Sequence, residues 1–258
     1  MIAAVITMLP ATERAQSVAS RVEAVGTGAV NFHFTGRPGI CGDGMRFMRI
    51  GSSFQGSFSS DMRSTPCVIG PVQVRLTLEQ GSVTRIETWV GAVRPRDGRD
   101  LGKVPAKESA QYLVSLAARG SSSASAKAIL PAVLAESAVV WPSLLVIARN
   151  AERSRSTRLD AAFWLSRFAA GALAGRSNDP LADDDADADD DLGLRQHAVF
   201  VLSQLPHGEG VPQLIHVAQS SVDQRVRSRA LFWLGQADDA RALTVFEEML
   251  TRARPDPL

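Results

Sequence analysis

The residues of this sequence that are best suited to chemistry lie in its first third. His33, Cys41, Asp43 and Cys67 supply an imidazole, two thiols and a carboxylate, groups that serve nucleophilic catalysis or zinc binding. A nucleophilic Cys41 with His33 as its base would need a third group to orient the imidazole, and the sequence suggests none. A zinc site usually shows Cys-x-x-Cys or paired-histidine spacing, which is also missing. We therefore expect no catalytic residue, no metal ligand and no cofactor site.

The two cysteines favour a disulfide instead. Cys41 lies three residues after Pro38 and Cys67 directly follows Pro66, so both belong to loops whose backbone can adjust to a cross-link. A bridge that closes a loop of this length would stabilise the fold by about 3 to 4 kcal/mol on the chain-entropy estimate. The pattern Gly39-x-x-Gly42-x-Gly44 matches neither nucleotide-binding glycine motif and is expected in a tight turn beside the bridge. A Cys41–Cys67 disulfide implies an oxidising compartment.

A further group of candidate functional residues is an acidic run, with seven aspartates between Asp183 and Asp191. Its centre resembles the start of a calcium loop, but position six is Asp190 instead of glycine and position twelve is Gln196 instead of glutamate. Two interpretations remain, a specific calcium site and a solvated insertion between helices, and the composition favours the second. We therefore expect an acidic insertion over residues 181–192.

Alternating apolar residues in the first hundred positions predict the strands that carry the cysteine loops. The period of two runs through Val30–Phe34, Val72–Leu78 and, less regularly, Val83–Val90. Residues 79–82 are expected to form a hairpin loop, and the slip in alternation between Val83 and Ile86 predicts a β-bulge. With a further strand over 45–50, residues 18–100 are expected to form a small antiparallel β domain of about four strands.

The first 17 residues bear on where the protein works. Met1–Leu9 is a short apolar run that resembles the core of a secretory signal, without the charged region that normally precedes it. We expect residues 1–17 to be a signal segment shortened at its start, and the protein to be periplasmic or secreted. If the segment is no signal, a cytoplasmic location is the alternative. No apolar run reaches the roughly 20 residues needed to span a bilayer.

The charge balance argues against a general binder of polyanions. The chain has net charge +1, with 12 basic and 8 acidic residues up to position 104 and 16 basic and 19 acidic residues after it. Nucleic-acid-binding domains usually carry a clear basic excess, which the rear part lacks. We therefore expect no nucleic-acid partner.

Helical periodicity begins after a charged connector at residues 93–100. One motif occurs three times, at residues 158–165, 195–202 and 227–234, each time with small or apolar residues along one helix face. The expected core positions are Ala161, Trp164 and Leu165; Ala198, Val201 and Leu202; and Ala230, Trp233 and Leu234. For Trp164 and Trp233, core packing is favoured over a binding platform.

A second pair of matching segments precedes two of these copies. Trp141–Ala148 and Val211–Ala218 correspond position by position, each with proline in the first helical turn. Paired helices in units of 32 to 37 residues indicate a stacked helical array over residues 104–253. A helix over Ala240–Leu250 is expected to close this array.

The last copy and its continuation, Ala230–Gln236 and Asp239–Leu243, resemble a HEAT or HEAT-like repeat. In such repeats a leucine-glycine helix end, a turn aspartate and an arginine early in the next helix recur. By this match Asp239 is the turn aspartate and Arg241 the arginine, while Asp238 stands where glycine is usual. The resemblance covers roughly residues 139–253 and implies an α-solenoid. The whole layout is similar, more loosely, to bacterial exported proteins with HEAT repeats.

The expected fold class is thus α+β, a small antiparallel β domain followed by a short all-α HEAT-like superhelical repeat array. The resemblance implies a non-catalytic scaffold or adaptor that binds another protein through its helical-repeat surface in the cell envelope, without a cofactor. Two alternatives come from other HEAT-like proteins. One is a lyase-type enzyme subunit, for which no nucleophile or acid–base pair is found. The other is a nucleic-acid-binding solenoid, which the charge of the rear part disfavours.

Overall fold

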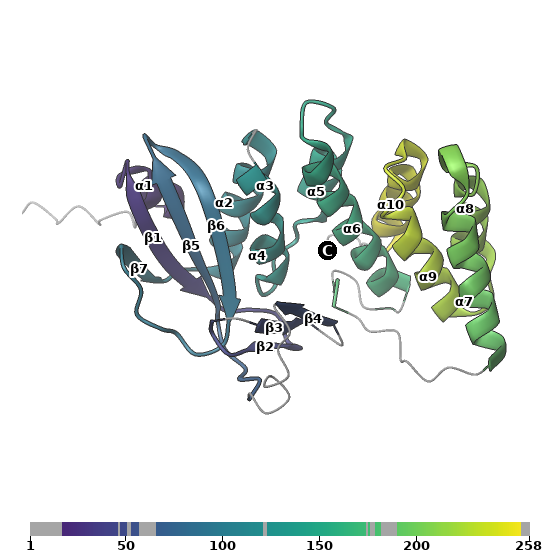
Figure 1. Cartoon of the computed structure of the whole chain (residues 1–258), viewed down its shortest axis with the longest axis horizontal. Coiled ribbons are helices and arrows are strands. Elements are labelled where there is room, and N and C mark those ends of the chain that lie inside the picture. The colour runs from purple at the N-terminus through teal and green to yellow at the C-terminus, as the bar shows by residue number, and fades with distance from the viewer. Residues whose placement is uncertain are drawn as a thin grey trace, which may run out of the picture.

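The computed structural model describes residues 17–253 apart from residues 46, 51–52, 57–65, 121–122, 174, 176–178 and 182–189. The expected signal segment, up to residue 16, and most of the expected acidic insertion lie outside the described residues. The described chain passes from a β-rich part into a helical part (Figure 1). None of its described helices is long and apolar enough to cross a membrane.

A four-stranded sheet with the order β6-β5-β1-β7 lies at one end of the molecule (Figure 1). Its strands are β1 (Gly28–Phe34), β5 (Val72–Glu79), β6 (Ser82–Val90) and β7 (Arg99–Lys103). β1 pairs antiparallel with β5, and β5 with β6. On β1 the alternate residues Val30, Phe32 and Phe34 are buried, as a period of two requires.

The β5–β6 hairpin has both features predicted from its sequence. Gln80 and Gly81 form its two-residue turn with φ of 49° and 77°, the positive values of a type I′ turn. The pairing with β5 shifts after Val83 and leaves Thr84 as an extra residue. The predicted bulge between Val83 and Ile86 is therefore confirmed.

The fourth strand corrects the expectation of a purely antiparallel sheet. β7 pairs parallel with β1, with Arg99 opposite Val30 and Lys103 opposite His33. Only Leu101 of β7 is buried, so the strand lacks the alternation by which strands are recognised in a sequence. The expected connector thus leads directly into an edge strand.

A smaller sheet lies beside the main one and carries the first cysteine. It consists of β2 (Ile40–Gly42), β3 (Phe47–Ile50) and β4 (Ser53–Gly56), paired antiparallel in chain order. β3 is the strand expected over residues 45–50.

Four helices lie against the sheets: α1 (Val18–Glu23), α2 (Ala106–Arg119), α3 (Ser123–Lys127) and α4 (Ile129–Leu134). α3 packs on β6 and α4 on β5, while α2 packs on α1 and α4. Pro131 lies in the first turn of α4, where a helix tolerates proline. The buried residues of the sheet and of the helices form one continuous hydrophobic core. The boundary expected at residues 100–104 therefore separates elements that share a core.

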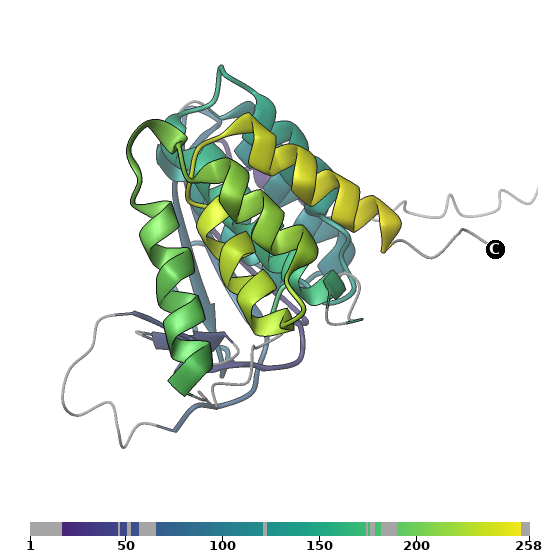
Figure 2. The same ribbon diagram turned by 90° about the vertical axis from the view of Figure 1, so that its right-hand side faces the viewer.

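The remaining helices form two layers, and their order in space differs from their order in sequence. They are α5 (Trp141–Arg149), α6 (Arg155–Leu173), α7 (Asp190–Ser203), α8 (Val211–Ser220), α9 (Gln224–Leu234) and α10 (Ala240–Arg252). One layer contains α6, α9 and α7, the other α5, α10 and α8 (Figure 1; Figure 2). α9 and α10 pack against α6 and α5, and α7 and α8 lie beyond them. α10, expected to close the array, therefore lies in its middle.

α9 meets α6 through equivalent positions of the repeated motif. Phe163 and Phe232 occupy the same motif position, and their ring centroids lie 6.1 Å apart. Ser166 and Gly235 are the next equivalent pair, and a Cβ atom on Gly235 would lie 2.7 Å from the Ser166 hydroxyl oxygen. The two helices thus approach closely because position 235 has no side chain.

The two helices also run in opposite directions. Arg155 and Arg158, at the start of α6, form ion pairs of 3.0 and 3.5 Å with Asp238, which follows the end of α9. Repeats stacked by translation would keep equivalent helices parallel. α6 and α9 carry equivalent copies of the motif but are antiparallel, so a simple translation of the repeat does not relate them.

Candidate protein-interaction surface

Five aromatic rings follow one another across the layer of α6, α9 and α7. On α6, Trp164 contacts Phe163 at a centroid distance of 5.1 Å, and Phe163 contacts Phe232 of α9 at 6.1 Å. Phe232 contacts Trp233 at 5.1 Å, and Trp233 contacts Phe200 of α7 at 5.2 Å. All four separations lie in the range of favourable ring pairs. We call these five residues the aromatic row.

The repeated motif generates the row because it places phenylalanine at the same position of each copy. Tryptophan follows this phenylalanine in the first and third copies, about 100° further around the helix. Trp164 is buried, whereas Phe163, Phe232 and Trp233 are half-buried and Phe200 is 36% exposed. Core packing, expected for both tryptophans, therefore describes Trp164 better than Trp233. The row passes from the core to the surface.

The first and third copies of the motif bury most of their expected core residues. Ala161, Leu165, Ala230 and Leu234 are at most 1% exposed. These side chains hold α6 and α9 in the layer and thereby fix the direction of the aromatic row.

The second copy departs from the expectation. Ala198 is exposed and Val201 is 49% exposed, while Leu202 is half-buried and Val199 is buried. α7 packs against α8 and α9 and is the last helix of its layer, so the outer side of the motif faces away from them (Figure 2). The assignment of Ala198 and Val201 to the repeat core is therefore wrong. The apolar residues of the motif do line one face of α7, but no described helix packs against the part of this face that carries Ala198 and Val201.

Two oppositely charged residues flank the row at equivalent motif positions. Arg229 places its guanidinium 5.4 Å from the ring centre of Phe232 and 5.5 Å from that of Trp233. The indole N–H of Trp233 is buried without a hydrogen-bond acceptor among the described residues. On α6 the equivalent residue is Asp160, and burial raises the pKa of its carboxyl. The row is thus flanked by a cation on α9 and by a partly exposed carboxyl group on α6.

A cavity of about 320 Å³ opens at the α6 end of the row. Phe163 and Trp164 form part of its wall together with apolar residues of β6 and α4. Asp160 of α6 and Lys127 of α3 supply its charged groups. The cavity therefore combines an aromatic and aliphatic wall with polar groups, one of each charge among them.

The turn between α9 and α10 contains the expected aspartate and arginine. Asp239 caps α10 and accepts a hydrogen bond of 2.8 Å from the backbone N–H of Arg241. The Arg241 guanidinium donates two more, of 3.0 and 2.7 Å, and this hydrogen bonding lowers the pKa of Asp239. Arg241 also donates to the carbonyl of Gly208, at 3.4 Å, in the α7–α8 turn. Asp238, at the position where glycine is usual, has a positive φ of 50°.

The C-terminal helices, which contain this turn, match a known protein family. Residues 184–258 match the family model that describes HEAT repeats. This end of the chain is similar to HEAT repeats. The match includes α7 to α10, whereas α5 and α6 lie before it. No curated protein and no solved structure matches the chain.

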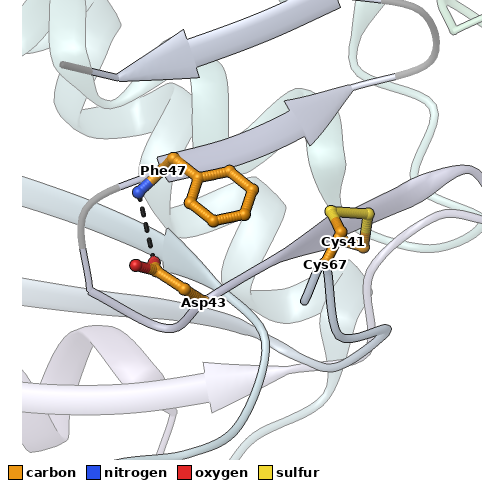
Figure 3. The surroundings of a disulfide bond; sticks show 4 residues. All are labelled: Cys41, Asp43, Phe47 and Cys67. Carbon is orange, nitrogen blue, oxygen red and sulfur yellow. Dashed lines mark hydrogen bonds between the residues drawn. A yellow bond between two sulfur atoms is a disulfide. The ribbon is translucent and has the colours of Figure 1, made fainter. Parts of the chain in front are cut away.

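The predicted disulfide lies in the β-rich part that precedes the HEAT repeats (Figure 3). Cys41 and Cys67 are bonded, with their Cα atoms 5.2 Å apart. Asp43 accepts a hydrogen bond of 3.1 Å from the backbone N–H of Phe47 and thereby stabilises the adjacent β2–β3 turn. Because both sulfur atoms are bonded, neither cysteine is a free nucleophile or a thiolate ligand. The residues that the structure describes contain no cluster of three or more His, Cys, Asp or Glu suited to a metal.

Arg37, a residue that the sequence did not single out, joins the β-rich part to the helices. It is 8% exposed, and its guanidinium donates to the carbonyl oxygens of Val133, at 2.7 Å, and Ala138. The guanidinium also lies 5.8 Å from the ring centre of Phe168 on α6. Burial lowers the pKa of Arg37. A single arginine in a loop gives no periodic signal, so its role emerges only from the fold.

Proposed function

We propose that the chain is a non-catalytic scaffold or adaptor, which binds another protein through the aromatic row of its helical repeats. HEAT repeats commonly mediate protein–protein interaction. The exposure of Phe200 and Val201 beside Trp233 and Arg229 supports this choice of surface. Aromatic residues and arginine are the types most enriched in the centres of protein interfaces.

We further propose that the protein takes no part in catalysis and uses no cofactor. The loss of both thiols to the disulfide supports this proposal. The excess of acidic over basic residues in the rear part, 19 against 16, favours a protein partner over a nucleic acid.

The proposed location is the cell envelope, in the periplasm or outside the cell. A disulfide supports this location because reductants keep most cytosolic thiols reduced. Fractionation of cells that express the tagged full chain is the test. Recovery with a cytoplasmic marker would contradict the proposal.

The binding proposal is tested by substituting the exposed end of the row. Phe200→Asp places a charge at the exposed end of the row while leaving the buried residues of α9 in place. Affinity chromatography of an envelope extract on the full chain should recover a partner, identified by mass spectrometry. The variant should recover at least about tenfold less of this partner, as expected when a charge replaces an aromatic residue that contributes strongly to an interface.

Val222→Asp is the matched control, because Val222 is 99% exposed in the α8–α9 loop, outside the row. It should recover the partner like the unmodified chain. Circular dichroism should show that both variants are folded. Equal recovery by the unmodified chain and the folded Phe200→Asp variant would contradict the proposed surface.

A further inference from the structure

The cavity at the α6 end of the aromatic row contains a carboxylate whose charge is not balanced by a contact. Asp160 forms no ion pair and accepts no hydrogen bond from a described residue, although Lys127 lines the same cavity. Lys127 is exposed at the rim and its long side chain can remain in water. Asp160 is exposed to solvent on one side, and its partial burial at the cavity raises the pKa of its carboxyl. Such a carboxylate gains from a cation brought by a ligand.

The rings beside Asp160 define which kind of cation fits. Phe163 and Trp164 meet at 5.1 Å with an interplanar angle of 76°, and their motif equivalents Phe232 and Trp233 meet at 5.1 Å with 83°. At the second pair, Arg229 supplies a guanidinium above both rings. The first pair has the same ring geometry, but its motif position carries Asp160 in place of the arginine.

We propose that this cavity receives an arginine side chain of the bound protein, with its guanidinium paired to Asp160 and stacked against the Phe163–Trp164 pair. The arginine would repeat at α6 the contact that Arg229 makes at α9. A planar guanidinium suits both parts of the site, since it stacks on aromatic faces and donates two hydrogen bonds to one carboxylate. This inference rests on the proposed protein-binding function and adds the chemistry of the partner at one point of contact.

The test uses the full chain and two small probes, N-acetyl-arginine methylamide and N-acetyl-citrulline methylamide. Citrulline has nearly the same shape as arginine and no charge. Binding is followed by the indole N–H signals in nitrogen-15 NMR spectra, assigned by single Trp→Phe substitutions. The arginine probe should shift the Trp164 signal saturably and bind at least about tenfold more tightly than the citrulline probe, because only it pairs with Asp160.

Asp160→Asn removes the charge while keeping the shape of the side chain. The arginine and citrulline probes should then bind this variant with about equal affinity. Glu152→Gln is the matched control, because Glu152 is an exposed carboxylate in the α5–α6 turn outside the cavity. It should keep the full preference.

Three results would overturn the inference: equal binding of the two probes, a preference that persists in Asp160→Asn, or the lack of a saturable shift at Trp164. Any of them, combined with partner recovery that still depends on Phe200, would leave the proposed function standing. If the arginine probe binds specifically but partner recovery does not depend on Phe200, the partner binds at α6 and not at α7.

Discussion

At the scale of single residues, the contact between α6 and α9 depends on the absence of a side chain at position 235. Gly235 has a helical φ of −64°, so its backbone alone would accept any residue. A Cβ atom there would lie 2.7 Å from the Ser166 hydroxyl oxygen and 3.1 Å from the carbonyl oxygen of Ala162. Glycine is therefore required at position 235 by the close packing of α6 and α9 and not by the backbone conformation.

Gly235→Ala is predicted to lower the free energy of unfolding by about 1 to 3 kcal/mol, the usual cost of overpacking a core. Adding Ser166→Gly should recover part of this loss by removing the nearest clashing atoms. Urea unfolding of the four proteins in this cycle measures the coupling. Strictly additive effects of the two substitutions would show that the helices do not meet at these positions.

Asp160→Asn is predicted to raise stability at neutral pH. Burial raises the pKa of Asp160 above its ordinary value of 3.8, so the folded state holds this proton more tightly than the unfolded state. Stability contributed by this group therefore falls as the pH rises from its ordinary pKa through the raised one. Because the carboxyl is partly exposed, screening by solvent limits the gain to about 0.5 kcal/mol.

Unfolding of the Asp160→Asn variant at neutral pH and near pH 3 tests this sign. The difference from the unmodified chain should disappear at the lower pH, where the carboxyl is protonated in both states. A variant that is less stable at neutral pH would show that the carboxylate has a stabilising partner.

At the scale of elements, α10 owes its defined start to the cap at Asp239. Asp239→Ala should destabilise the protein by about 1 kcal/mol through the loss of this cap. Hydrogen bonds from Arg241 lower the pKa of Asp239 below its ordinary 3.8, so the charged form stabilises the fold above that pH. This contribution is lost as the pH falls through the lowered pKa.

Asp239→Asn separates the two roles of this residue, because asparagine can cap a helix without carrying a charge. It should keep most of the stability at neutral pH and lose the pH dependence in urea unfolding. If Asp239→Ala is as stable as the unmodified chain, the cap does not stabilise α10.

Elements were predictable from the sequence where their signal is local. Proline in the first turn marks the starts of α5 and α8, and Gly81 marks the β5–β6 turn. β7 was missed because Leu101 is its only buried residue. The motif in α7 resembles that in α6, yet Val201 is exposed where Trp164 is buried. Burial depends on the presence of a neighbouring helix, which a local pattern does not encode.

At the scale of the whole molecule, the disulfide is expected to be a major source of stability. It joins positions 26 residues apart within the β-rich part. Reduction should lower the free energy of unfolding by about 3 to 4 kcal/mol on the loop-entropy estimate. Urea unfolding with and without reductant measures this change, and mass analysis after alkylation should find both thiols protected before reduction. Two freely alkylated cysteines in periplasm-derived protein would contradict both the bond and the proposed compartment.

The arrangement of the helical pairs lay beyond what the sequence could predict. It depends on contacts such as Phe163 with Phe232 and Arg158 with Asp238, which join residues about 70 to 80 positions apart. For the same reason the aromatic row was missed, although its two tryptophans were noticed. Only the meeting of three helices turns separate rings into one surface.

The position of α9 and α10 between the other helical pairs has a consequence for how the chain folds. A regular repeat array can grow unit by unit as it is synthesised, since each unit docks on the one before it. Here α7 and α8 emerge from the ribosome before α9 and α10, which carry their docking surface. They must wait as an undocked hairpin until α10 has emerged. Limited proteolysis of nascent chains arrested before α9 should therefore cut α7 and α8 readily, while the β-rich part is already protected.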